Sequence, residues 1–207
     1  MPLYLDYNAT TPVDPRVLEV MIDIYQNHYG NAASRTHQFG MEAKKLVNQA
    51  RQSIAAILNV DSSEVIFTSG ATESDNLAIQ GLAKWGRENA KMHIISTPIE
   101  HKAVLEPLQY LASQGFELEL VPVGSSGRVD AEEVIRRVRS DTLLVSVMHV
   151  NNETGVIQPV DEIGSALADT DTFFHIDAAQ SFGKLVEEIR NTKYDLLSVS
   201  GHKIYGP

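Results

Sequence analysis

The sequence predicts an α/β fold in which helices cover a mostly parallel sheet. Apolar runs of strand length alternate with amphipathic stretches of helix length along the 207 residues, a pattern typical of parallel strands joined by helical crossovers. No internal repeat or low-complexity linker interrupts this alternation. A chain of this length can bury about 70% of its unfolded surface, so it can build a core without disulfides.

Two helices are expected first. Asp14 is a suitable N-cap and Pro15 suits the first helical position, and the apolar residues that follow share one face as far as Tyr25. The second helix is expected over residues 41–58, where apolar residues recur at helical spacing.

A regular alternation of strands and helices is expected after residue 64. Gly115 is a suitable terminator for one of the helices, and Asp130 with Glu133 forms an approximate capping box for the next. Pro159 suits the start of another helix. The expected strands cover residues 65–68, 93–96, 118–121, 143–148, 173–176 and 196–199, and the expected helices cover 73–82, 103–113, 131–138 and 159–167.

Composition excludes several classes of function. The 17 Lys and Arg against 27 Asp and Glu give a net charge of −10, which argues against nucleic-acid partners, because binding phosphates requires clustered basic residues. The chain contains no cysteine, so it has no disulfide, no zinc–thiolate site and no thiol nucleophile, and we expect no metal. The N-terminus lacks a basic segment followed by an apolar run, and no apolar run is long enough to span a membrane. A cytoplasmic protein without a membrane partner is expected.

Polar clusters follow the carboxyl ends of five expected strands. In an open α/β sheet, ligands bind in the crevice outside these strand ends. Each cluster alone could be a turn, since Ser, Gly, Asn and Asp are common turn residues. The coincidence of five clusters favours one shared pocket. They comprise residues 69–72, residues 100–101, residues 151–153, Asp177 with Gln180, and residues 200–203.

Three of these clusters have a specific chemistry. Residues 68–72 join a strand to a helix, so free backbone N–H groups at the helix N-terminus suit a phosphate, although the segment matches neither a Walker loop nor a dinucleotide fingerprint. Lys203 follows a Ser-Gly-His turn, where burial could lower its pKa enough for a Schiff base. Asp177 could pair with a pyridinium nitrogen. An exposed lysine and a turn-capping aspartate are the alternatives, but together the three describe a pyridoxal 5′-phosphate (PLP) site.

The order of the motifs resembles that of cysteine desulfurases, which are fold-type I PLP enzymes related to class V aminotransferases. The resemblance covers the whole chain. It rests on residues 5–12 (LDYNATTP), 68–76 (TSGATESDN), 100–101 (EH), 149–155 (HVNNETG), 175–180 (HIDAAQ) and 200–203 (SGHK).

The resemblance implies a role for each catalytic residue. Lys203 would form the Schiff base with PLP and then move the substrate Cα proton, and Asp177 would keep the ring nitrogen protonated. His101 would stack on the ring and serve as an acid or base, which suits an imidazole. Asn152 and Gln180 would bond the phenolic oxygen of the ring.

The remaining site residues are implied in the same way. Asn8 and Ala9 would lie on the substrate side of the site. The phosphate would be held by Ala71, Thr72, Ser200 and His202.

The resemblance also implies the architecture and the reaction. The fold would be the fold-type I large domain, a three-layer sandwich, left incomplete. Residues 1–15 would form an N-terminal segment associated with the small domain, and residues 16–207 a PLP-binding large domain without its C-terminal strand and small domain. The family converts L-cysteine to L-alanine and passes sulfur through a persulfide on a mobile cysteine to an acceptor for iron–sulfur cluster biogenesis or tRNA thiolation. A homodimer is expected.

That catalytic cysteine, and the arginine that binds the substrate carboxylate, would both lie beyond Pro207. We therefore expect a truncated, split or partial gene product that is inactive and marginally stable alone. A related PLP lyase or aminotransferase, such as selenocysteine lyase, is the alternative enzyme. A non-catalytic PLP-binding or protein-binding remnant is the alternative of another class. The sulfur acceptor and the oligomeric state of this chain stay open.

Overall fold

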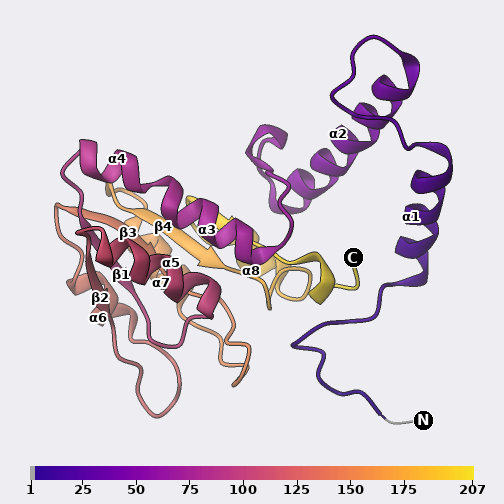
Figure 1. Cartoon of the computed structure of the whole chain (residues 1–207). Coiled ribbons are helices and arrows are strands. Elements are labelled where there is room, and N and C mark those ends of the chain that lie inside the picture. Colours follow the sequence, from indigo (N-terminus) through magenta and orange to yellow (C-terminus); the bar gives the residue numbers. More distant parts are fainter. Residues whose placement is uncertain (1–2) are drawn as a thin grey trace. The chain divides into compact units, whose positions relative to one another are not determined.

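The computed structural model describes residues 3–207, which fall into two compact units (Figure 1). The first unit contains the residues up to Ala9 and residues Thr68–Ser200, and the second contains Thr10–Phe67 and Gly201–Pro207. The expected division into an N-terminal segment of residues 1–15 and a large domain of residues 16–207 stays a prediction. No helix within residues 3–207 combines the length and the apolar character needed to cross a bilayer.

The first unit is built on a five-stranded sheet in the order β2-β1-β3-β4-β5 (Figure 1). Every neighbouring pair of strands is parallel, which confirms the predicted α/β fold with a parallel sheet. The strand β2 lies on one side of β1, and β3 lies on its other side. The strand order therefore reverses between β1 and β3, and ligands bind at such a reversal in open α/β sheets. The strands are β1 (His93–Ser96), β2 (Glu117–Leu120), β3 (Thr142–Ser146), β4 (Phe173–Asp177) and β5 (Leu196–Ser198).

Helices pack on the sheet in two groups. The helices α3 and α5 contact each other, as do α6 and α7, and right-handed crossovers place α5 and α7 on opposite faces. Between α3, α5 and the sheet lies a core that includes Ile79, Ile94 and Leu108. The helices of this unit are α3 (Ala71–Gly81), α4 (Ala83–Glu88), α5 (Lys102–Ser113), α6 (Ala131–Arg136), α7 (Val160–Leu167) and α8 (Val186–Asn191).

The second unit contains the two helices expected first, α1 (Pro15–Asn27) and α2 (Gln38–Leu58), with the short 3₁₀ helices η1 (Ser62–Glu64) and η2 (Gly201–Lys203). Asp14 caps α1 as predicted, because its side chain accepts a 2.8 Å hydrogen bond from the Arg16 N–H. The helix α2 begins three residues earlier than predicted, because the His37 imidazole accepts a hydrogen bond from the Gly40 N–H.

The predicted strand over residues 65–68 is wrong. Val65 has an extended backbone (φ −84°, ψ 117°), but no strand pairs with this segment in the part of the chain that the structure describes. A strand is stable only when its backbone groups are paired along a ladder. Here the Val65 carbonyl accepts from the Arg51 guanidinium, which lies 4.8 Å from the centre of the Phe67 ring. Ile66 is 66% exposed.

Candidate functional site

Hydrogen bonds join the loops that follow β1, β3, β4 and β5 at one edge of the sheet of the first unit. Parallel strands share a direction, so their carboxyl ends meet at this edge, as the sequence predicts. The loops are held there by hydrogen bonds from Met148 N–H to Glu100 Oε1 (3.0 Å), from Asn151 Nδ2 to Ile99 O (3.0 Å), from His149 N–H to Asp177 O (2.9 Å) and from Ala178 N–H to Ser198 O (2.8 Å).

Asp177 is the last residue of β4, and only 6% of it is exposed. Its Oδ1 atom accepts a 2.9 Å hydrogen bond from the Ala179 N–H. A buried carboxylate held in this way needs a cation or a donor nearby. The protonated nitrogen of a pyridine ring is a suitable partner.

Three predicted site residues from separate parts of the chain come together beside this strand end. The Asn8 side chain donates to the Asn152 carbonyl (3.2 Å), and the Gln180 side chain donates to the Asn8 carbonyl (2.8 Å). Gln180 Oε1 is buried, with no hydrogen-bond partner within residues 3–207. Leaving such an atom unpaired costs about 1 to 3 kcal/mol. A ligand polar group in this position would satisfy the amide, so these residues fit a ring that carries a phenolic oxygen.

The N-terminus of α3 fits a phosphate. Gly70 is its N-cap and provides no side-chain cap, so the N–H groups of Ala71 and Thr72 lack partners within the helix and can bind an anion. The Glu73 carboxylate accepts from the Ser69 N–H at the same turn, and this backbone hydrogen bond lowers the pKa of Glu73.

His101 is the N-cap of α5, and its side chain is accessible. Its Nδ1 atom accepts a 3.1 Å hydrogen bond from the Ala103 N–H, so the neutral imidazole carries its proton on Nε2. Together with Thr72, His101 lines a cavity of about 460 Å³ between α3 and α5. The structure thus brings one expected phosphate ligand and the expected ring-stacking residue to one cavity.

Lys203 and His202 belong to the second unit, in η2. The His202 carbonyl accepts from both the N–H (3.0 Å) and the hydroxyl (2.8 Å) of Thr11, and its imidazole lies 3.0 Å from the Thr10 hydroxyl. Lys203 is half-buried, and Ser200, which is buried, ends the last segment of the first unit. The roles of Lys203, His202 and Ser200 in binding PLP stay predictions.

Glu100 is a residue of this site whose role sequence reasoning missed. Its Oε1 atom accepts from the Thr97 hydroxyl (2.7 Å) and the Met148 N–H (3.0 Å), and 5% of the residue is exposed. Burial raises the pKa of Glu100 to about 8, because the hydrogen bonds offset only part of the desolvation and the negative charges of Asp177 and Asp75 add to it. The only sequence signal was the position of Glu100 beside His101.

The sequence placed Asn151 in a candidate cluster but did not predict its role. Its Oδ1 atom accepts from the N–H groups of Glu153 (3.0 Å) and Thr154 (2.9 Å), while its Nδ2 atom donates to the Ile99 carbonyl. This arrangement folds the turn after β3 around one side chain and presents the neighbouring Asn152. The Asn-Asn pair in the sequence was a signal for such a turn.

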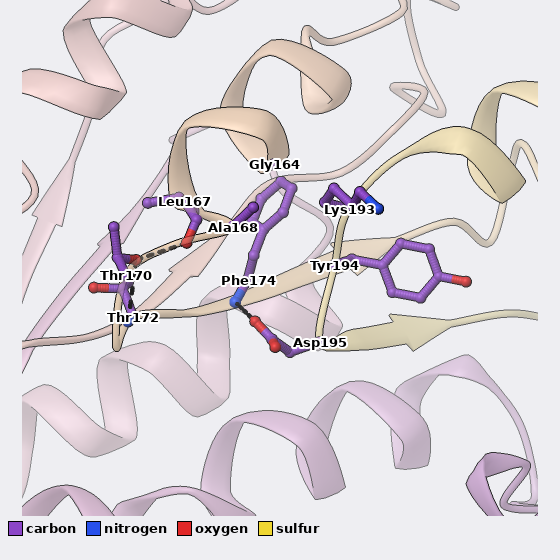
Figure 2. Close-up of a pocket in the computed structure, with 9 residues that line it drawn as sticks. All are labelled: Gly164, Leu167, Ala168, Thr170, Thr172, Phe174, Lys193, Tyr194 and Asp195. Atoms are coloured by element: carbon purple, nitrogen blue, oxygen red, sulfur yellow. Dashed lines mark hydrogen bonds between the residues drawn. The ribbon is translucent and has the colours of Figure 1, made fainter. Parts of the chain in front are cut away.

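A second cavity, of about 190 Å³, lies at the amino ends of β4 and β5 (Figure 2). Its walls include Thr170, Thr172, Lys193 and Asp195, and the Asp195 carboxylate accepts a 2.7 Å hydrogen bond from the Phe174 N–H. None of the predicted site residues lines this cavity. Residues 3–207 contain no cluster of three or more His, Asp or Glu side chains that could hold a metal ion.

Comparison with known proteins agrees with this geometry. The sequence model of the family Aminotransferase class-V matches residues 3–207. The mitochondrial cysteine desulfurase of Candida albicans is 49% identical over 206 residues, which cover the whole chain and 42% of that relative. The chain thus spans less than half the length of this curated relative.

Two solved structures are similar. DndA from Streptomyces lividans is 51% identical with a TM-score of 0.89, and the match covers 99% of this chain and 57% of DndA. SspA, solved in complex with cysteine, is 43% identical with a TM-score of 0.89, and the match covers 100% of this chain and 59% of SspA. The chain belongs to the class-V aminotransferase family, whose members use pyridoxal 5′-phosphate.

Proposed function

We propose that this chain carries the PLP-binding machinery of a cysteine desulfurase, a sulfurtransferase that converts L-cysteine to L-alanine. The observation that carries the proposal is the buried carboxylate of Asp177 at the end of β4, in the unit where the α3 N-terminus presents free N–H groups. The identity to cysteine desulfurases over the whole chain supports the reaction. The complex of SspA with cysteine supports the substrate.

Different residues bind the cofactor and transfer protons. When bound, PLP supplies an electron sink that allows bonds at the Cα and Cβ atoms of an amino acid to break. Asp177 would keep the ring nitrogen protonated through its buried carboxylate. The N–H groups of Ala71 and Thr72, with Ser200 and His202, would hold the phosphate, and Asn152 and Gln180 would bond the phenolic oxygen.

The remaining residues act on the substrate. Lys203 would hold the cofactor through Nζ and would move the substrate Cα proton. His101 would stack on the ring and would serve as an acid or base. Asn8, which contacts both Asn152 and Gln180, forms the substrate side of the site with Ala9.

Sulfur leaves the substrate for a thiol outside these 207 residues, because the chain contains no cysteine. The reaction balances as cysteine plus an acceptor thiol giving alanine plus the acceptor persulfide. We propose that a sulfur-acceptor protein or an iron–sulfur scaffold then takes the sulfur from that thiol, that the working assembly is a homodimer and that the compartment is the cytoplasm, although the Candida albicans relative is named a mitochondrial enzyme.

The test uses the chain within a complete enzyme or a complemented complex, because the 207 residues alone are expected to be inactive. The protein is loaded with PLP and given L-cysteine and a thiol, and alanine and sulfide are measured. We expect alanine to form in proportion to the protein, and only when PLP and thiol are both present. A complete enzyme or complemented complex that binds PLP but forms no alanine from cysteine would overturn the proposed reaction and leave a PLP-binding remnant. Release of alanine from selenocysteine but not from cysteine would instead identify a selenocysteine lyase.

A further inference from the structure

A row of buried polar side chains crosses the sheet of the first unit one step before the site. Ser96, Ser146, His175 and Ser198 come from β1, β3, β4 and β5, and all four are almost fully buried. Their bonds run from strand to strand: Ser96 Oγ to Ser146 O (2.9 Å), Ser146 Oγ to His175 Nδ1 (2.9 Å), and His175 Nε2 to Ser198 Oγ (3.0 Å).

The position of this row ties it to Asp177. Side chains two residues apart on a strand share one face of the sheet, so His175 and Asp177 lie on the same face of β4. The imidazole of His175 is bonded to the strands on both sides, β3 and β5. These two hydrogen bonds fix the position of β4 between its neighbours, two residues before Asp177.

A carboxylate from α3 completes the arrangement. Asp75 is fully buried, and its Oδ1 atom lies 3.5 Å from His175 Nε2. A carboxylate on this side favours the tautomer with the proton on Nε2, which leaves Nδ1 to accept from the Ser146 hydroxyl. Burial lowers the pKa of His175 to about 4, so the ring is neutral and its two nitrogens have distinct roles.

Polar groups of this kind are costly in a sheet core. A buried hydroxyl or imidazole costs free energy unless it is fully bonded, and apolar side chains fill the neighbouring positions Ile94, Leu144 and Ile176. An apolar row would satisfy packing alone. The directional hydrogen bonds also define the position of β4 relative to β3 and β5, and packing alone defines it less strictly.

We propose that Asp75 and His175 form a positioning pair that holds the Asp177 carboxylate in place for the ring nitrogen of PLP, an inference that rests on the proposed function. Neither residue is a catalytic residue. The pair acts through Asp177, by fixing β4 between its neighbours and orienting the imidazole.

A matched control separates positioning from ordinary core stability. His93 is also a fully buried strand histidine, and its Nδ1 atom lies 2.9 Å from the Thr142 hydroxyl. It is the first residue of β1, at the opposite end of the sheet from Asp177. His93→Asn therefore removes the same kind of side chain without touching β4.

The experiment measures the ring nitrogen itself. Wild type, His175→Asn and His93→Asn are loaded with PLP labelled with ¹⁵N in the ring, and the ¹⁵N chemical shift is followed against pH. The shorter Asn cannot keep the contacts of Nε2, so we expect the apparent pKa of the ring nitrogen in His175→Asn to fall by about one pH unit or more. His175→Gln, whose amide nitrogen reaches the place of Nε2, should recover most of this shift, and His93→Asn should titrate as wild type does.

Each result decides the proposal. An unchanged titration in His175→Asn, or an equal shift in His93→Asn, would overturn the positioning role while leaving the proposed function intact. A wild-type chain that binds no PLP would overturn both. If His175→Asn fails to fold, Asp75→Asn takes its place with the same expected shift, and an unchanged titration in that variant overturns the proposal.

Discussion

The carboxyl group of Glu100 accepts a 3.0 Å hydrogen bond from the backbone N–H of Met148, across the two strand-end loops that follow β1 and β3. The same oxygen, Oε1, accepts from the Thr97 hydroxyl, whereas Oε2 is buried without a hydrogen-bond partner in the described residues. Glu100 thereby fixes the turn that carries His101 against the strand that leads to Asn151. It is a buried acid that links two parts of the site.

Glu100→Gln is expected to change how stability depends on pH. The folded-state pKa of Glu100 is about 8, above the ordinary value of 4.5, chiefly because of burial. Between these values the folded protein holds a proton that the unfolded chain releases, so stability falls as pH rises from about 4.5 to 8. Glu100→Gln removes the titrating group, so the free energy of unfolding should decrease less over this pH range, by up to about 5 kcal/mol.

Urea unfolding of wild type and Glu100→Gln at a series of pH values measures this effect. The two curves should agree most closely near pH 4 and diverge toward pH 8, with the variant the more stable at high pH. The exposed Glu106→Gln serves as the control. Parallel curves for wild type and Glu100→Gln across this range would contradict a neutral Glu100 in the folded protein.

Local sequence signals predicted most of the elements because their causes are local. Asp14 and Pro15 fix the start of α1 through one hydrogen bond and one constrained dihedral angle, and five of the six expected strands carry enough apolar residues to be recognised. The strand expected over residues 65–68 failed because a strand depends on a partner, which no window of sequence reveals. Pro107 lies inside α5 without ending it, in agreement with the helix predicted over residues 103–113.

The candidate site was predictable to the extent that it follows strand ends. Asp177, Gln180 and Asn152 each follow an apolar run, so their positions could be read from the sequence. The link that Asn8 makes between Asn152 and Gln180 could not, because it joins residues more than 140 positions apart. The burial of Glu100 and the row through His175 likewise arise only when the strands are side by side.

Gly164→Ala is expected to destabilise the first unit. A Cβ atom at this position in α7 would lie 2.2 Å from the Lys193 carbonyl oxygen, beside the cavity in Figure 2, and backbone atoms cannot rotate away as a side chain can. Overpacking of this kind costs about 1 to 3 kcal/mol. Gly81→Ala in α3 is the control, because its Cβ would meet nothing within 4 Å and alanine is the better helix former by up to about 1 kcal/mol. The midpoint of thermal unfolding should therefore fall in Gly164→Ala and rise in Gly81→Ala. Equal midpoints in the two variants would contradict the close contact at Gly164.

Lys203 is expected to be the lysine that binds PLP covalently. Reduction of the loaded protein with borohydride, followed by peptide mapping, should place the pyridoxyl group on Lys203, and Lys203→Ala should abolish the label. Lys184 is the informative comparison, because its Nζ atom donates to the Gln180 carbonyl (3.2 Å) and so contacts a predicted site residue. Lys184→Ala should keep the label. A pyridoxyl group on Lys184 or Lys193 would refute the assignment.

Asp177→Asn is expected to keep PLP bound but to slow turnover, because the phosphate and lysine anchors remain while the ring nitrogen loses its anionic partner. Loss of one essential charge-stabilising group costs about 3 to 4 kcal/mol, which corresponds to about 10² to 10³ in kcat. Asp195→Asn is the matched control. That carboxylate also accepts a backbone hydrogen bond, from the Phe174 N–H at the opposite end of β4 (Figure 2), and its loss should leave kcat within about twofold. PLP stoichiometry from absorbance and alanine production from L-cysteine measure both effects in the same samples, with each variant placed in a complete enzyme or a complemented complex that turns over. If Asp177→Asn bound PLP fully and turned over at the wild-type rate, the carboxylate at the end of β4 would have no part in stabilising negative charge on the substrate.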